Sequence, residues 1–262
     1  MNSYIDIEWF YLLLSLLILI LPIGIFYKYK TGLTKIVLLS FFRMLIQLIF
    51  VGLYLKYFIE WDNIFLNILW IIIMIVIGSH TVVKRAELNT KLMTIPVIGG
   101  FLTGFIIATI IVGFVVFAEG DYFTARFMIP ISGMLIGNSL STTVVGVRLF
   151  YKMIKERQKY YYYNLILGAN KEESLFEFMK DALKDSFNPM LANIGAIGLI
   201  WIPGTMTGQI IAGSDPMIAI KYQLVIVTGY FTCCTLAVFV SLMFSRRIAI
   251  DKYGRINNDI FN

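Results

Sequence analysis

Seven long apolar segments constrain this chain more than any other feature of its sequence. Each is about twenty residues long, which is the length an α-helix needs to cross a hydrocarbon core of roughly 30 Å. None shows the alternation of apolar and polar residues expected of a membrane β-barrel strand. They predict one all-α integral membrane domain over residues 1–262, with about seven transmembrane helices. The segments lie at 9–27, 36–59, 64–83, 95–118, 127–150, 191–212 and 222–244.

The composition supports a lipid environment. Hydrophobic residues make up 59% of the chain and charged residues only 15%, whereas soluble domains have roughly 45–50% apolar and about 25% charged residues. A water-soluble fold is therefore excluded, and the lipid bilayer is the first expected partner.

The distribution of Lys and Arg predicts the orientation of the chain. Most of the 22 basic residues follow the first, third, fifth and seventh apolar segments. Because cytoplasmic loops retain Lys and Arg, we expect the N-terminus outside and the C-terminus in the cytoplasm. The net charge of +6 is then a consequence of topology, so no nucleic-acid partner is expected. The acidic residues on the opposite loops have two explanations: outer loops exclude Lys and Arg and tolerate carboxylates, or these carboxylates form a site that handles cations.

The segment 151–189 is the one stretch with room for structure outside the membrane. Asn170 followed by Glu173 predicts a helix start with reciprocal capping, and Pro189 is expected to end this helix. Such a two-faced pattern is typical of an amphipathic helix. Its apolar positions recur every fourth residue, at Leu175, Met179, Leu183 and Phe187.

The polar face of this helix carries both signs of charge. Helices that bind anionic lipid show an excess of Lys and Arg, whereas a balanced face also suits a protein partner. The sequence favours a protein partner and leaves a position on the membrane surface open. The charged residues are Glu177, Lys180, Asp181, Lys184 and Asp185.

Helix-breaking residues interrupt the fifth and sixth apolar segments. Lipid does not tolerate free backbone groups, so these runs predict either discontinuous helices along a substrate path or close helix packing through glycine pairs. Both interpretations stay open, and both can hold. The residues concerned are Pro130, Gly133, Met134, Gly137, Asn138 and Ser139 in the fifth segment, and Pro203, Gly204, Met206, Gly208 and Gln209 in the sixth.

Arg43 and Gln47 lie one helical turn apart in the second segment, on the same face. An unpaired charge at the centre of a span costs about 2.5–3.5 kcal/mol on insertion scales. Arg43 is therefore either a structural anchor or part of a substrate path.

The motifs of several enzyme classes are missing from the sequence. His80 is the only histidine, which excludes a multi-histidine metal site, so metal ligands stay unknown. There is no GxxxxGK[ST] phosphate loop, HExxH or GxSxG motif. If the protein uses ATP, another chain must bind it.

Several of these residues resemble one known family along most of the chain. They include Arg43 with Gln47, Pro130 with Gly133 and Met134, Gly137 with Asn138, Leu167-Gly168-Ala169, Ile202-Pro203-Gly204, Met206, Gly208 and Tyr222-Gln223. In this pattern the chain resembles the FetB-type permeases of bacterial ABC transporters, which are linked to iron export and similar to the membrane subunits of plant aluminium-tolerance transporters. Thr205 departs from the family, in which a second methionine is usual.

The resemblance implies a permease subunit and not an enzyme, located in the bacterial cytoplasmic membrane. ATP and magnesium would bind a separate ABC-type ATPase, and a second copy of the permease would complete a homodimer. The expected ATPase-coupling residues are Gly168, Asn170, Glu173, Glu177, Lys180, Leu183 and Lys184. The expected substrate path consists of Arg43, Gln47, Pro130, Met134, Asn138, Ser139, Pro203, Gly204, Met206 and Gln209. The alternative is a stand-alone secondary transporter or channel for a small cation or metabolite.

Overall fold

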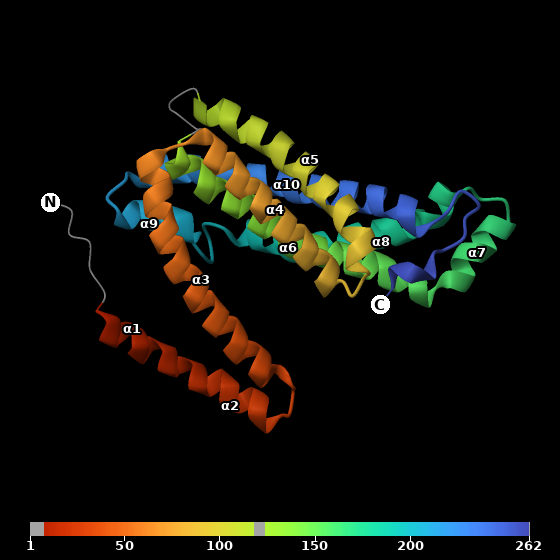
Figure 1. Ribbon diagram of the computed structural model, residues 1–262, viewed down its shortest axis with the longest axis horizontal. Coiled ribbons are helices and arrows are strands. Elements are labelled where there is room, and N and C mark those ends of the chain that lie inside the picture. The colour runs from red at the N-terminus through yellow and green to blue at the C-terminus, as the bar shows by residue number, and fades with distance from the viewer. Residues whose placement is uncertain (1–7, 118–123, 262) are drawn as a thin grey trace. The chain divides into compact units, whose positions relative to one another are not determined.

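A computed structural model describes residues 8–117 and 124–261, and helices are its main elements (Figure 1). The chain divides into two compact units, Met1–Asp62 and Asn63–Asn262. Six helical stretches of the described residues are long and apolar enough to cross a membrane. The last residue of the predicted fourth segment, Ala118, lies outside the described residues.

The first unit is a helical hairpin. Its first arm contains α1 (Trp9–Leu16), the short 3-10 helix η1 (Leu17–Leu19) and α2 (Ile20–Lys28), and its second arm is α3 (Leu33–Trp61). Gly32 precedes α3 with a φ of +74°, a left-handed conformation that glycine adopts without steric cost. No described side chain of α2 or α3 is buried within this unit, which suits helices whose apolar side chains face lipid.

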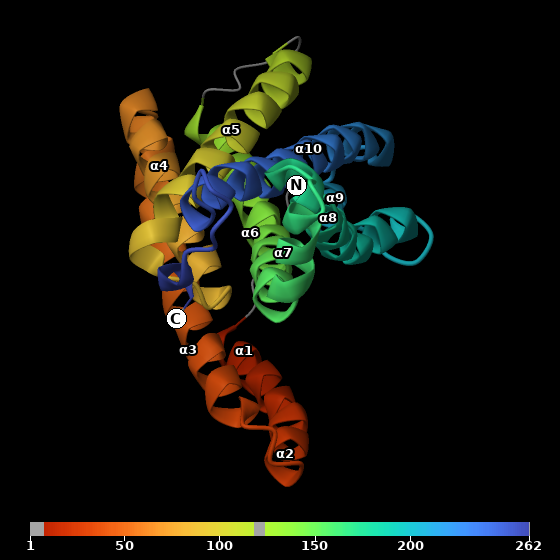
Figure 2. The same cartoon turned by 90° about the vertical axis from the view of Figure 1, so that its right-hand side faces the viewer.

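The second unit packs four long helices around a common core. These are α4 (Ile64–Arg85), α5 (Thr90–Phe117), α6 (Ala125–Glu156) and α10 (Pro216–Ala249). In this unit α10 lies along α5, while α4 lies along α6 (Figure 1, and end-on in Figure 2). The remaining elements are α7 (Gln158–Ile166), α8 (Lys171–Ala196), α9 (Gly204–Ile211) and the 3-10 helix η2 (Asn258–Ile260).

Glycines bring α5 and α10 into close contact. A Cβ atom built on Gly100 would lie 2.7 Å from the carbonyl oxygen of Ala237, and one built on Gly104 would lie 2.5 Å from that of Cys233. Membrane helices approach this closely only where the side chains are very small. One of the two interpretations left open by the sequence expects such packing at Gly133/Gly137 and Gly204/Gly208 instead. Gly137, Gly204 and Gly208 meet open space within the described chain, so these three glycines make no close contact of the kind seen on α5.

The predicted sixth segment, 191–212, is not one helix, and the expectation that Pro189 ends the amphipathic helix is wrong. α8 continues through Pro189 to Ala196 as a single helix of 26 residues. A proline inside a helix removes one backbone hydrogen bond, and the packing of α8 on α6, with Ala182 and Ser186 buried, supports the helix near that point.

The break in this region falls after α8. Gly198 adopts a φ of +82°, its N–H donates to the carbonyl of Trp201 at 3.0 Å, and the chain then enters α9, which has only eight residues. The Trp201 indole N–H donates to the carbonyl of Asn193 at 3.4 Å. These bonds satisfy backbone groups that a helix would otherwise pair. The fifth segment, in contrast, is continuous, because Pro130 lies inside α6 without interrupting it.

The predicted start of α8 is confirmed. The Asn170 side chain accepts from the backbone N–H of Glu173 at 2.9 Å, and the Glu173 carboxylate accepts from the backbone N–H of Asn170 at 2.8 Å. Gly168, two residues before the cap, has a φ of +94° and ends α7 in a left-handed turn.

Replacing this cap should loosen the first turn of α8. Asn170→Ala is expected to cost roughly 1 kcal/mol of stability, because the N–H of Glu173 loses its acceptor. Hydrogen exchange at residues 171–174 would show it as faster exchange. Asn188→Ala is the matched control, since the side chain of Asn188 makes no hydrogen bond to another described residue. Equal exchange in the two variants would contradict the capping role.

The C-terminal segment, residues 250–261, ties several helix ends together. The N–H of Asn89, after α4, donates to the carbonyl of Ile260 at 2.9 Å, and the hydroxyl of Tyr161 in α7 donates to the carbonyl of Gly254 at 3.1 Å. Burial raises the pKa of Tyr161 to about 12, so this hydroxyl stays a donor at neutral pH. This segment and α7 lie at the same end of the second unit (Figure 1).

Candidate functional site

A cavity of about 480 Å³ lies among α6, α8, α9 and α10, next to the break between α8 and α9. It forms because α9 is short and returns toward α10, where Thr205 contacts Gln223. Its walls mix polar and apolar side chains. The lining residues are Met134, Asn138, Ser141, Thr142, Val145, Ser186, Pro189, Met190, Asn193, Ile197, Trp201, Pro203, Gly204, Thr205, Gln223, Ile226 and Tyr230.

One hydrogen bond joins two sides of this cavity. The Thr205 hydroxyl and the Gln223 side-chain oxygen lie 2.5 Å apart, so the hydroxyl donates and the amide oxygen accepts. Gln223 is only 7% exposed. A buried amide with a defined partner fixes the geometry of both side chains, so this bond sets the position of α9 against α10.

The polar side chains that α6 contributes to the cavity wall donate their hydrogen bonds to backbone carbonyls of the same helix. The hydroxyls of Ser141 and Thr142 approach the backbone carbonyl of Asn138 at 3.0 Å and 3.2 Å, and the Asn138 amide donates to the carbonyl of Met134 at 2.8 Å. Hydroxyl and amide groups that donate to their own helix keep acceptor lone pairs for a bound species. The wall can therefore coordinate a cation or accept hydrogen bonds from a solute.

The usual ligands of a tightly bound metal ion do not gather in the part of the chain that the structure describes. No cluster of three or more His, Cys, Asp or Glu side chains that could hold a metal ion occurs among the described residues. The cavity instead offers neutral amide, hydroxyl and thioether groups, which are weaker ligands than carboxylates or thiolates. This donor set suits transient contact with a cation that must leave again.

The structure brings together only some of the residues expected on the substrate path. Met134, Asn138, Pro203 and Gly204 line the cavity, whereas Pro130, Ser139, Met206 and Gln209 do not. Arg43 and Gln47 are exposed side chains of the first unit.

Ser139 has a packing role behind the cavity wall. Its hydroxyl donates to the carbonyl of Leu135 at 2.7 Å and lies 3.2 Å from the sulfur of Cys233. Cys233 and Cys234 are both free thiols and buried, as expected for small apolar packing residues.

Sequence patterns do not predict most of the polar lining. Ser186 and Asn193 flank Pro189, where the sequence predicts a helix end that the structure does not contain, so nothing in the sequence makes them neighbours. Thr205 and Gln223 were noted only for the family resemblance. A polar amide inside the last apolar segment was a usable signal for Gln223, because buried polar groups in membrane spans mark functional positions.

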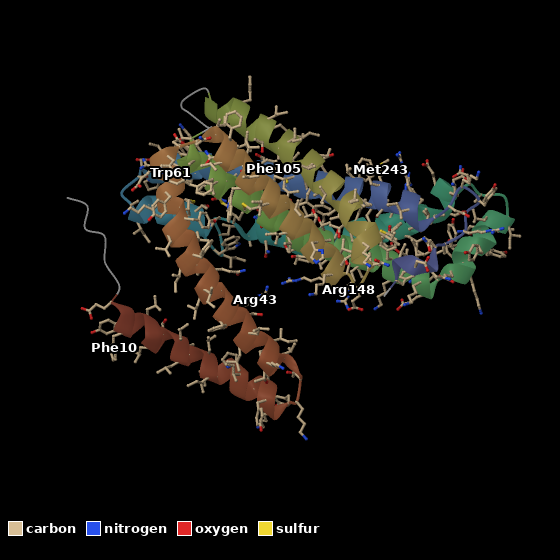
Figure 3. The ribbon with its side chains drawn as sticks, viewed as in Figure 1. Phe10, Arg43, Trp61, Phe105, Arg148 and Met243 are labelled. Atoms are coloured by element: carbon tan, nitrogen blue, oxygen red, sulfur yellow. The ribbon has the colours of Figure 1, made fainter. Side chains whose placement is uncertain are left out.

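The residues expected to contact an ATPase lie along the first four turns of α8 and just before it. Glu177 and Lys180 form an exposed ion pair at 3.3 Å, and Lys184 is exposed. Leu183 lines an apolar groove of about 610 Å³ between α8 and α10, together with Met179 and Met243; Met243 is labelled in Figure 3. Lys180 also lines this groove, so the mixed charges of α8 lie at its exposed face and along the edge of the groove.

The helical spans define an all-α, multi-pass integral membrane protein, and a cavity with mixed polar and apolar walls lies among its helices. The chain belongs to the Uncharacterised protein family UPF0014, whose model matches residues 9–250.

Three relatives show the range of this family. The chain is 31% identical to UPF0014 membrane protein YjkA of Bacillus subtilis, over 87% of this chain and 92% of the relative. It is 30% identical to the Probable iron export permease protein FetB of Escherichia coli, over 90% of both chains. It is 28% identical to Protein ALUMINUM SENSITIVE 3 of Arabidopsis thaliana, over 90% of this chain and 88% of the relative. No solved structure matches the chain significantly.

Proposed function

We propose that this protein is the permease subunit of an ABC transporter and that it exports a metal cation, with iron as the first candidate. ATP and magnesium would bind a separate ATPase, and two permeases would pair in the working complex. The observation that carries the proposal is the cavity beside the α8–α9 break, whose mixed walls contain amide, hydroxyl and thioether groups. The name of the Escherichia coli relative supports iron as the cargo.

The chemistry of the cavity suits passage of a cation. Amide and hydroxyl oxygens, such as those of Asn138 and Thr205, can replace part of a cation's water shell. The thioethers of Met134 and Met190 also lie in the wall and add softer ligands. A site built from neutral donors holds the ion weakly, which allows release after each cycle.

The continuity of α8 offers a direct route from ATPase to cavity. Its outer part carries the Glu177–Lys180 ion pair, and its last turns supply Pro189 and Asn193 to the cavity wall. A helix of 26 residues is about 39 Å long. Closure of the ATPases would move the first turns of α8, and the displaced helix would change the cavity wall at its last turns. This would shift the balance between the inward-open and outward-open states of the permease.

The stand-alone transporter has less support. A gradient-driven carrier uses ionisable groups at membrane depth as relays. Among the described residues that line the cavity there is no Asp, Glu, Lys, Arg or His.

A charge swap on α8 tests the coupling. Glu177→Lys with Lys180→Glu keeps the net charge and the pairing within the helix, but inverts the charge pattern shown to a partner. We expect the swapped permease to assemble in membranes while its stimulation of the cognate ATPase falls by about tenfold, the loss for 1.4 kcal/mol of partner contact. Coupled ATP hydrolysis in proteoliposomes measures this.

Glu156→Lys with Lys159→Glu serves as the control, because it swaps exposed charges near the α6–α7 junction. Full ATPase stimulation by the α8 swap would reject the coupling role. Separately, the cation is identified by iron accumulation in cells with and without the gene. Unchanged accumulation, together with unchanged iron efflux from proteoliposomes, would reject iron as the cargo.

A further inference from the structure

A second polar cavity, of about 210 Å³, lies where the ends of α4 and α6 meet the C-terminal segment. Its polar wall contains Glu87, Arg148, Lys152 and Lys155, and Phe261 closes it. Arg148, labelled in Figure 3, belongs to the second unit, as do all the other lining residues. The cavity of about 480 Å³ among α6, α8, α9 and α10 shares none of these residues.

The charge balance of this cavity is positive. Arg148, Lys152 and Lys155 follow one another at spacings of four and three residues, so they share one face of α6. Glu87 is the one acidic residue among the described residues that line the cavity. It binds Arg148 at 2.7 Å, which leaves an excess of two positive charges. The contact of Lys152 with Glu156 is 3.8 Å long between exposed side chains and contributes little.

A helix-ending turn and a cation–π contact shape the walls of this cavity. The backbone N–H of Leu88 donates to the carbonyl of Val83 at 3.2 Å, which closes the end of α4 in the type of turn that usually contains glycine. Glu87 occupies the glycine position with a φ of +62°, and this turn directs its carboxylate to Arg148. On the opposite wall, the ammonium of Lys155 lies 5.1 Å from the centre of the Phe261 ring.

The helix ends alone do not account for three cations. A basic residue in the last turn of a helix offsets the partial negative charge there, and Lys155 can do so for α6, which ends at Glu156. Lys152 and Arg148 lie one and two turns further back along α6, where that effect has faded. Membrane topology accounts for basic residues on this side in general, but not for the gathering of three of them around one cavity.

We propose that this cavity binds a phosphate group, supplied by the headgroup of an anionic phospholipid. The lining residues lie at or just beyond the ends of the apolar segments 64–83 and 127–150, so we expect the cavity at the depth of the lipid headgroups. The distribution of Lys and Arg predicts that this side faces the cytoplasm, where basic pockets between helices bind acidic headgroups. A free phosphate ester has the same chemistry and is one arm of the test.

The test uses the purified full-length protein and native mass spectrometry to measure retained lipid. We expect the protein to retain phosphatidylglycerol in preference to phosphatidylethanolamine. Lys152→Gln with Lys155→Gln should weaken that retention by about tenfold, whereas Arg157→Gln with Lys159→Gln, which removes the same charge from exposed neighbouring positions, should leave it unchanged. Glu87→Gln should strengthen retention, because it removes the competing carboxylate.

The increase in phosphatidylglycerol retention expected from Glu87→Gln separates binding at this site from misfolding, because misfolding should not make the protein retain this lipid more selectively. Competition by glycerol 1-phosphate at millimolar concentration would assign the site to free phosphate esters as well as lipid, and its failure to compete would assign the site to lipid alone. Equal retention of the two lipids by the unmodified protein, equal losses in the two double variants, or weaker retention by Glu87→Gln would each overturn the proposal.

Discussion

Gly100→Ala is expected to separate α5 from α10 and to lower the stability of the protein by about 3 kcal/mol, the upper range for overpacking a core. The new methyl group would overlap the Ser241 hydroxyl and lie 2.7 Å from the carbonyl oxygen of Ala237. The backbone of α10 cannot rotate away as a flexible side chain can, so the two helices must move apart. Ser241 is fully buried at this contact.

The measurement is the midpoint of thermal unfolding in detergent, read from the fraction of protein that stays monodisperse. Gly137→Ala is the matched control, because no atom lies within 4 Å of the added methyl group in the described chain. That variant should keep its midpoint or gain slightly, since alanine favours helix by about 1 kcal/mol over glycine. A midpoint for Gly100→Ala equal to that of Gly137→Ala would show that the α5–α10 seam is not closely packed.

Gln223→Leu is expected to reduce transport by at least about tenfold, which corresponds to a loss of 1.4 kcal/mol from the transport barrier. The change removes the amide from the cavity wall and leaves the Thr205 hydroxyl without the acceptor that lies 2.5 Å away. A buried polar group without a partner costs about 1–3 kcal/mol, so α9 should also lose its fixed position against α10.

Thr205→Val tests the same contact from the other side. It should reduce transport less, because the Gln223 amide can still face the cavity. The two changes together should cost less than the sum of the single changes, as expected for residues in direct contact. Initial rates of cation flux into proteoliposomes that contain the cognate ATPase measure all three variants.

Gln209→Leu provides the control for this experiment, because Gln209 lies on α9 but not on the cavity wall. Its transport rate should match that of the unmodified protein. A larger loss from Gln209→Leu than from Gln223→Leu would place the substrate path elsewhere and contradict the assignment of the cavity.

The residues at helix starts show what local sequence can predict. Asn170 and Glu173 are three residues apart, so each can bond to the backbone N–H of the other at a helix start without help from distant residues. The cap of α8 is therefore predictable from this spacing alone. Proline gave a weaker signal. Pro189 and Pro130 both lie inside continuous helices, because neighbouring packing outweighs the loss of one backbone bond.

Long-range contacts decided the rest of the site. Asn138, Asn193 and Gln223 come from three helices, and nothing in their spacing shows that they share a cavity. The same holds for the glycine seam, since glycines at 100 and 104 look no different in sequence from those at 133 and 137. What distinguishes them is the helix that lies opposite, here α10 at Ala237.

The sequence by itself determined that this is an all-α membrane protein. Each span must be long enough, apolar and internally hydrogen-bonded to cross lipid, so each segment shows this property without reference to the others. It also determined the family and the capped start of α8. Only the tertiary structure decided that α8 runs unbroken into the cavity wall, that Thr205 bonds to Gln223, and that Glu87 pairs with Arg148. These features depend on which helices become neighbours, and packing over the whole unit sets that arrangement.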